Sequence, residues 1–498
     1  MIKQPLYKQM IALALVCIIL FMINTAIAAS SDAVINAVCA VLLALWAASV
    51  CVYRRSKRYK PDDYAWFFIT GGFIICTIFV FKLPYTFSFH DITVYPVDFS
   101  LDTLADGHLA YIGYIVETGH LPTESPLIAR YSIFYNPPFY HLVQAAFIQM
   151  NKLLNISPAI FVENTQIITL FAAGGCMLVT RQLLQELGAT GKGIAAGMLM
   201  FCFQPMLYLY GATINNDILS VLLIEMTILY TLRWRRTQKF SDIVFIALSL
   251  GLGMATKLSV ATLIPSIAIV FVVCFFQNLP AWKKYCQQFV SFLLISVPLA
   301  TAWPLYQLIV NKVPLNYVRL PSEVLNVSEF SFAKRFGIPD WHAIRSAFFK
   351  VDTLSQHNIW MQTLKTGVYD ELILFEEGTW MWYAGYLFIV LFAALLLVSL
   401  GLFIRMLISK KHGIPTLDKV FISSYAILLI GSYLKFYIDY PYICSTNFRY
   451  ITPVLMLCAL AIAIYRSTTS SKRSLWVVLY SGVFAVYGLG IYALHLFA

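Results

Sequence analysis

Long apolar segments recur from one end of this chain to the other. They run to about 17–25 residues, the length an α-helix needs to cross the hydrocarbon core of a bilayer. Of the 498 residues, 60% are hydrophobic and only 12% are charged, whereas a soluble domain is usually about half apolar and about a quarter charged. Helices satisfy their own backbone hydrogen bonds in lipid. The sequence therefore predicts an all-α polytopic membrane protein.

About thirteen crossings are predicted from these segments. They cover about 9–29, 33–53, 65–83, 158–182, 193–210, 214–233, 241–257, 259–276, 288–310, 381–404, 418–437, 447–465 and 475–497. Lys3 and Lys8 precede the first apolar segment, and small residues end it. A cleaved signal peptide is therefore an alternative. A second apolar segment follows almost at once, which favours an uncleaved helix.

The basic residues indicate the orientation of the chain. The formal net charge is +11, and most of it lies in short loops: Arg54–Lys60, Arg233–Arg236, Lys283–Lys284, Lys410–Lys411 and Arg466–Arg473. This is the positive-inside pattern of an inner-membrane protein, and it places these loops and the N-terminus in the cytoplasm. No nucleic-acid-binding module accompanies the charge.

The segment of about 139–154 is apolar but is not counted as a crossing. If it crossed, Arg233–Lys239 would lie outside, against the positive-inside rule. Its histidine, amides and lysine suit a helix at the membrane surface. The stretch of about 84–157 then becomes one large outer loop that contains this interfacial helix.

The first half of that outer loop holds the candidate catalytic acids. Residues of about 100–119 show helical spacing of apolar side chains, and Gly119 is predicted to end the helix. Asp102 and Asp106 are four residues apart and would share one face, where a carboxylate can act as a general base or hold a metal. The alternatives are an N-cap for Asp102 and a solvated face for Asp106. His108 would orient Asp106 or a phosphate, or form an ordinary interfacial hydrogen bond.

Three further charged residues are predicted at outer ends of crossings. Asp217 follows two asparagines, and its alternative is an N-cap. Lys257 and Arg449 run against the positive-inside bias, and charges at the edge of the apolar region tend to be functional. Their expected ligand is a lipid-linked phosphate, and the alternative is snorkelling to ordinary headgroups.

No cofactor is indicated by the sequence, and a divalent cation stays open because no ligand spacing is diagnostic. Nearly all of the ten cysteines lie inside apolar segments, and no CxxC occurs. Neither a disulfide framework nor a zinc site is therefore expected. The outer loop of about 312–380 is rich in acids and too long for a simple connection, which favours a functional role.

Four short passages together resemble the GT-C membrane glycosyltransferases, in the bacterial branch related to protein O-mannosyltransferases and to the aminoarabinose transferases that modify lipid A. The passages are Asp106-Gly107-His108 with Tyr111-Ile112 and Gly119-His120-Leu121-Pro122, then Tyr135-Asn136-Pro137-Pro138-Phe139-Tyr140, then Asn216-Asp217 with Thr256-Lys257, and finally Arg449-Tyr450 with Pro453. Each passage is short. Their order, spacing and predicted topology carry the resemblance from about residue 65 onward.

The resemblance implies a GT-C fold and an inverting sugar transfer from a polyprenyl-phosphate donor on the outer face of the membrane. The acceptor would be a hydroxyl of a glycan, lipid or protein. Asp106 would be the base and Asp217 a second acid that helps to position acceptor or base. The residues expected at the substrate or its phosphate are His108, Lys257, Arg449, Tyr450 and Tyr135.

The sequence also departs from the family in two respects. Gly107 replaces the second acid of an Asp-Glu pair, which leaves Asp102 open as the base, and two crossings precede the usual first one. We therefore expect two extra helices in residues 1–64, a core in 65–311 with the catalytic loop 84–157, an outer loop in 312–380 and C-terminal helices in 381–498. A flippase for lipid-linked sugars is the alternative function, with Glu225 as its one acid inside a crossing. A polysaccharide polymerase or ligase is the other.

Overall fold

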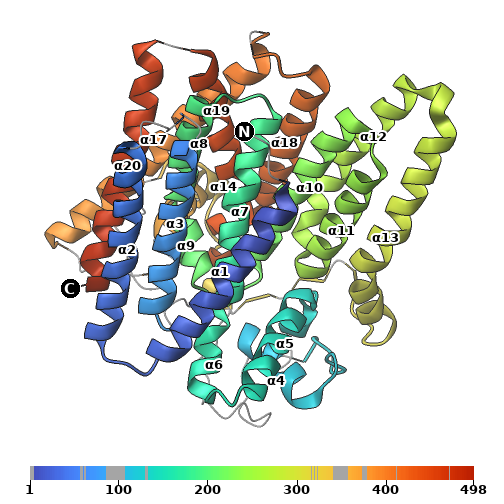
Figure 1. The fold of residues 1–498 in the computed structure, drawn as a ribbon. Helices are drawn as coiled ribbons and strands as arrows, with labels where there is room; N and C mark the ends of the chain where they lie inside the picture. The colour runs from blue at the N-terminus through green and yellow to red at the C-terminus, as the bar shows by residue number, and fades with distance from the viewer. Residues whose placement is uncertain are drawn as a thin grey trace.

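The computed structural model describes residues 5–55, 60, 63–85, 107–128, 133–315, 317–318, 320–321, 323–339, 357–372, 378–410, 412–469 and 471–497. In these residues the chain forms helices and no strand (Figure 1); an isolated bridge joins Asn326 and Tyr442. The all-α prediction is therefore confirmed for this part of the chain.

The long helices follow the predicted segments along the chain. They are α1 (Leu6–Ile27), α2 (Asp32–Arg55), α3 (Asp63–Lys82), α7 (Gln166–Glu186), α8 (Gly191–Cys202), α10 (Asp217–Thr237), α11 (Phe240–Thr256), α12 (Ile264–Gln277), α13 (Trp282–Ile309), α17 (Trp380–Ile408), α18 (Thr416–Asp439), α19 (Val454–Thr468) and α20 (Lys472–Phe497). Shorter helices are α4 (His108–Thr118), α5 (Phe139–Leu153), α6 (Pro158–Asn164), α9 (Pro205–Gly211), α14 (Phe332–Phe336) and α16 (Ile359–Tyr369). Single 3₁₀ turns include η3 (Leu258–Leu263), η6 (Ile443–Thr446) and η7 (Phe448–Ile451).

Among the described residues, nine helical spans are long and apolar enough to cross a membrane. Two bent pairs raise the number to 11: α8 with α9, at 55°, and η6–η7 with α19, at 41°. α11 is apolar but shorter, and α10 carries acids at its start and centre and arginines at its end. The protein is thus a multi-pass membrane protein, and the count of thirteen stays a prediction.

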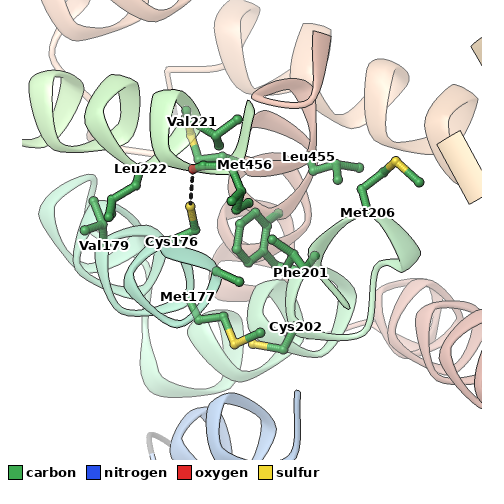
Figure 2. Close-up of a cluster of buried hydrophobic side chains, with 14 of the residues drawn as sticks. Cys176, Met177, Val179, Phe201, Cys202, Met206, Val221, Leu222, Leu455 and Met456 are labelled. Atoms are coloured by element: carbon green, nitrogen blue, oxygen red, sulfur yellow. Dashed lines mark hydrogen bonds between the residues drawn. The ribbon is translucent and has the colours of Figure 1, made fainter. Parts of the chain in front are cut away.

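The best-packed part of the bundle lies where α7, α8, α9, α10 and α19 meet. Figure 2 shows Cys176, Phe201 and Met456 within this apolar cluster. α8 and α19 approach closely because glycine faces the partner helix: a Cβ on Gly197 would lie 2.7 Å from the carbonyl oxygen of Ala459. Small residues permit this kind of contact between membrane helices, where lipid offers no hydrophobic drive.

The first helix is part of this bundle. α1 packs against α7 and α6, and its buried side chains belong to the main core. Its Asn24 Nδ2 donates to Asn164 Oδ1 at 2.9 Å, and Asn164 Nδ2 donates in turn to Asn151 Oδ1 on α5 at 2.9 Å. This buried amide chain connects α1 to α5 through α6.

The basic end of the bundle is held by ion pairs. Arg235, at the end of α10, donates from Nη2 to Asp418 Oδ2 at 2.7 Å, and Asp418 is fully buried in the first turn of α18. Arg236 pairs with Glu186, at the end of α7, at 2.9 Å. The ends of α7 and α10 and the start of α18 therefore share one face of the bundle with the predicted cytoplasmic loops.

The first outer loop differs from the prediction at one end of its helix. Gly119 ends α4 in the left-handed conformation, at φ 73°, as predicted. Gly107, however, has φ 138° and ψ 175°, which is not helical, and α4 begins only at His108. The helix expected over about 100–119 is thus described only from His108 onward, and Asp102 and Asp106 lie outside the described residues. The interfacial helix was expected at about 139–154 and is α5; α4 and α5 lie together at one end of the bundle (Figure 1).

Candidate active site

A cavity of about 580 Å³ opens among the ends of α10, α11 and α18 and the segments before α5 and α19. α10 begins there with Asp217 and ends at the basic face with Arg235 and Arg236. At 1.5 Å per residue this helix is about 30 Å long. The cavity and the basic face therefore lie at opposite ends of the bundle.

Six of the eight residues singled out by sequence line this cavity. They are His108, Tyr135, Asp217, Lys257, Arg449 and Tyr450. They come from four regions that are far apart in the chain. The other two, Asp102 and Asp106, lie outside the described residues.

Asp217 and Lys257 form an ion pair at the wall of the cavity. The Asp217 side chain is 3% exposed and that of Lys257 is 19% exposed, so the lysine is the partner that water and ligands reach. Asn216, not Asp217, occupies the N-cap position of α10. Its Nδ2 donates to the carbonyl of Thr256 at 2.9 Å and ties the start of α10 to the end of α11. The N-cap alternative for Asp217 is therefore not what the structure shows.

The ring of Tyr450 contacts two cations. Lys257 Nζ lies 5.1 Å from its ring centroid and Arg449 Cζ lies 5.2 Å from it. Arg449 Nη2 also donates to the Tyr450 hydroxyl at 3.3 Å. Such ring contacts hold a cation in place without neutralising its charge. The arrangement gives one wall of the cavity two oriented positive groups, as an anionic ligand requires.

A carboxylate pair at the same cavity was not singled out by the sequence. Asn447 Nδ2 lies 3.3 Å from Glu371 Oε1 and 3.4 Å from Asp370 Oδ1, and its Oδ1 accepts from the Arg449 N–H at 2.9 Å. Glu371 lines the cavity. Asp370 has φ 56°, an unusual value for a non-glycine residue that is often found at functional sites. These acids were two among many in the 312–380 loop, and no spacing distinguished them.

Behind this pair lies a buried lysine on α16. Lys365 is only 4% exposed. Burial lowers the pKa of Lys365, while the nearby charges of Glu371 and Asp370 oppose that shift. Lys365 therefore offsets part of the negative charge of Glu371 and Asp370.

The remaining wall comes from the segment before α5 and from α4. The Tyr135 carbonyl accepts from Trp303 Nε1 at 3.2 Å, and its ring meets Tyr317 edge-on at 5.2 Å. Burial raises the pKa of the Tyr135 phenol, so it stays protonated and able to donate. His108 is 3% exposed, and its Nδ1 lies 2.9 Å from Nε2 of His141.

No group of three or more histidines, cysteines, aspartates or glutamates that could hold a metal ion occurs in the part of the chain that the structure describes. The ten cysteines are all free thiols. A requirement for a divalent cation stays an open prediction.

The family model for dolichyl-phosphate-mannose-protein mannosyltransferases matches residues 136–303, about a third of the chain. This match supports membership of the GT-C superfamily. The matched segment contains Asp217 and Lys257, and it ends before Glu371 and Arg449.

One solved structure is also similar to this chain. It is the crystal structure of ArnT from Cupriavidus metallidurans in the apo state, with 12% sequence identity and a TM-score of 0.34, covering 80% of this chain and 76% of that one. This TM-score is too low for the similarity to support a statement about the fold. A comparison of the sequence with curated proteins found no match.

Proposed function

We propose that the protein transfers a sugar from a polyprenyl-phosphate-linked donor to an acceptor hydroxyl at the outer face of the cytoplasmic membrane. The observation that carries this proposal is the wall of the cavity where Lys257 and Arg449 contact the ring of Tyr450. A phosphate bound there would face two cations. The family match supports the same class of donor, since that family is named for mannose carried on dolichyl phosphate.

The charge on the phosphate changes during such a reaction. The bond from the sugar C1 to the phosphate oxygen breaks, and a bond forms from C1 to the acceptor oxygen. The acceptor proton passes to a carboxylate. The phosphate changes from a diester with one negative charge to a monoester with about two. Cations beside it therefore stabilise the transition state more than the bound donor, which is the requirement for catalysis.

The roles of the acids follow from their partners. Asp217 is engaged with Lys257, so we assign it the positioning of that cation, not proton abstraction. Asp106 remains the proposed base and Asp102 the alternative. The carboxylate base deprotonates the acceptor hydroxyl, and the acceptor oxygen attacks C1 on the face opposite the phosphate. This single displacement inverts the configuration at C1.

The placement of the cavity supports the outer face. It lies about 30 Å from the arginines at the other end of α10, and the positive-inside rule puts those arginines in the cytoplasm. Glu225, the acid of the flippase alternative, is fully buried and accepts from Thr180 Oγ1 at 3.0 Å. It does not line the 580 Å³ cavity, and this separation disfavours a transport pathway through it.

The test uses purified protein in liposomes with a panel of polyprenyl-phosphate sugars. Release of free polyprenyl phosphate is followed in wild type, Asp106→Asn and Asp102→Asn, with thermal unfolding as the check on folding. We expect release in wild type and its loss in Asp106→Asn. Loss only in Asp102→Asn would move the base to that residue. Absence of release from every donor, with labelled lipid-linked sugar crossing the bilayer instead, would overturn the proposal in favour of the flippase.

A further inference from the structure

Two histidines form a buried pair at the wall of the cavity that α4 and the segment before α5 supply. His108, the first residue of α4, lines the cavity, and His141, in the first turn of α5, lies behind it with no exposed surface. Their ring nitrogens, His108 Nδ1 and His141 Nε2, are 2.9 Å apart. The rings are nearly parallel, with centroids 5.2 Å apart. The cavity therefore meets one imidazole, and the second imidazole meets only protein.

A hydrogen bond between two imidazoles requires one N–H and one lone pair. The pair cannot carry two added protons in this arrangement, because both facing nitrogens would then be donors. Burial, and to a lesser extent the neighbouring His108, lowers the pKa of His141 well below its usual value. His141 is accordingly the neutral member, and any added proton resides on His108.

The surroundings of His141 decide which of its nitrogens carries the hydrogen. The Pro137 backbone carbonyl favours a proton on the His141 ring, and because Nε2 faces His108, we place the hydrogen of neutral His141 on Nδ1. A carbonyl only accepts, so a proton on Nδ1 leaves Nε2 of neutral His141 with its lone pair. That lone pair then accepts from His108 Nδ1–H. The Tyr111 ring stacks on His141 with centroids 4.0 Å apart and holds the ring plane.

We propose that His141 is a positioning residue that accepts the Nδ1 proton of His108 and so makes His108 Nε2 the atom that gains and loses a proton at the cavity. This inference rests on the proposed function. A protonated Nε2 donates to the phosphate of the donor, and the hydrogen bond to His141 stabilises that imidazolium. Other titratable groups around the pair are Tyr111 on α4, Tyr140 on α5, Asp217 on α10, Lys257 just after α11 and Tyr306 on α13.

The sign of the pH effect follows from this arrangement. Donor binding through His108 requires its charged form, so kcat/KM for the donor falls as pH rises through the pKa of His108. His141→Phe keeps a ring to stack on Tyr111 but removes the lone pair. The His108 imidazolium loses its acceptor, and the fall in kcat/KM moves to lower pH. We expect a shift of about one pH unit, which is about a tenfold loss on the alkaline side.

Two readouts test the proposal, and one does not depend on activity. The ¹⁵N shifts of selectively labelled histidine report which nitrogen of neutral His108 carries the hydrogen, and His108→Gln assigns its signals. We expect Nδ1–H in wild type and a change in His141→Phe. His141→Gln, whose side-chain carbonyl can accept from His108, restores most of the wild-type pH profile. His120→Phe is the matched control, because His120 is exposed just after the same helix and should change neither readout.

Two results would overturn the proposal. One is a wild-type His108 whose neutral form carries its hydrogen on Nε2. The other is a folded His141→Phe variant with the pH profile and His108 shifts of wild type. If His141→Phe fails to fold, the wild-type shifts and His141→Gln still decide the question. Wild-type protein that is inactive with every donor would refute the proposed function, while the ¹⁵N shifts would continue to test the pair.

Discussion

Replacement of Lys257 by methionine separates the two tasks that the structure gives this lysine. Lys257 pairs with the buried Asp217 and faces the cavity where we place the departing phosphate. Methionine keeps the length and apolar stem of the side chain and removes the charge. A purely structural lysine and a catalytic one predict different behaviour when Asp217 is replaced as well.

The expected magnitudes come from the two environments. Removing one partner of a buried ion pair costs about 3–5 kcal/mol. Because Lys257 is 19% exposed at an open cavity, we expect less, about 2 kcal/mol, for Lys257→Met. Loss of one group that stabilises developing negative charge costs about 2.7–4 kcal/mol in the transition state, or about 100–1,000-fold in kcat.

The assay is the initial rate of polyprenyl phosphate release from liposomes, with thermal unfolding measured on the same preparations. Lys257→Met should be less stable and about 100–1,000-fold slower. The double variant Lys257→Met with Asp217→Asn removes the unpaired carboxylate, so its stability should return close to wild type while its rate stays low. A double variant that recovers a rate within about threefold of wild type would refute the catalytic role and leave only the structural one.

Three other predictions concern the second cation and the packing. Arg449→Lys keeps the charge but loses the planar fork, so kcat/KM should fall about tenfold; equal activity in a donor titration would mean that a point charge is enough. Gly197→Ala should lower thermal stability by about 1–3 kcal/mol, because the added Cβ would press on α19. Gly401→Ala is the matched control and should leave stability unchanged, because nothing lies within 4 Å of its Cβ. Equal unfolding temperatures for the two variants would contradict the close approach of α8 and α19. Asn24→Leu should cost about 1 kcal/mol by leaving an Asn164 oxygen without its donor, and wild-type stability in thermal unfolding would show that the amide chain does not hold α1.

The carboxylates Glu371 and Asp370 are linked to Arg449, so their variants are tested together with those of the cations. Glu371 and Asp370 face the side-chain amide of Asn447. The Oδ1 atom of that amide accepts a hydrogen bond from the backbone N–H of Arg449. Any change at these acids therefore reaches Arg449 through one amide. Variants of Glu371 should accordingly be compared with Arg449→Lys before a direct contact with substrate is assigned to the acid.

Much of the fold was determined by the sequence itself. Hydrophobic length and the positions of basic loops are local signals, and they predicted the helical segments and an interfacial helix that matches α5. Gly119 ended α4 as predicted, because a residue without a Cβ adopts the left-handed conformation at little cost. The charges of Lys257 and Arg449 were also visible locally, since cations are uncommon where a crossing meets the outer face.

Only the tertiary structure decided which of these residues meet. The sequence did not indicate that Asp217 would pair with Lys257, that the ring of Tyr450 would contact two cations, or that Asn447 would connect Arg449 to Glu371. His141 carried no signal that distinguished a buried partner from an ordinary interfacial histidine. Side-chain partners depend on how helices distant in sequence pack, and that packing is set by shape and burial across the whole bundle, not by any local pattern.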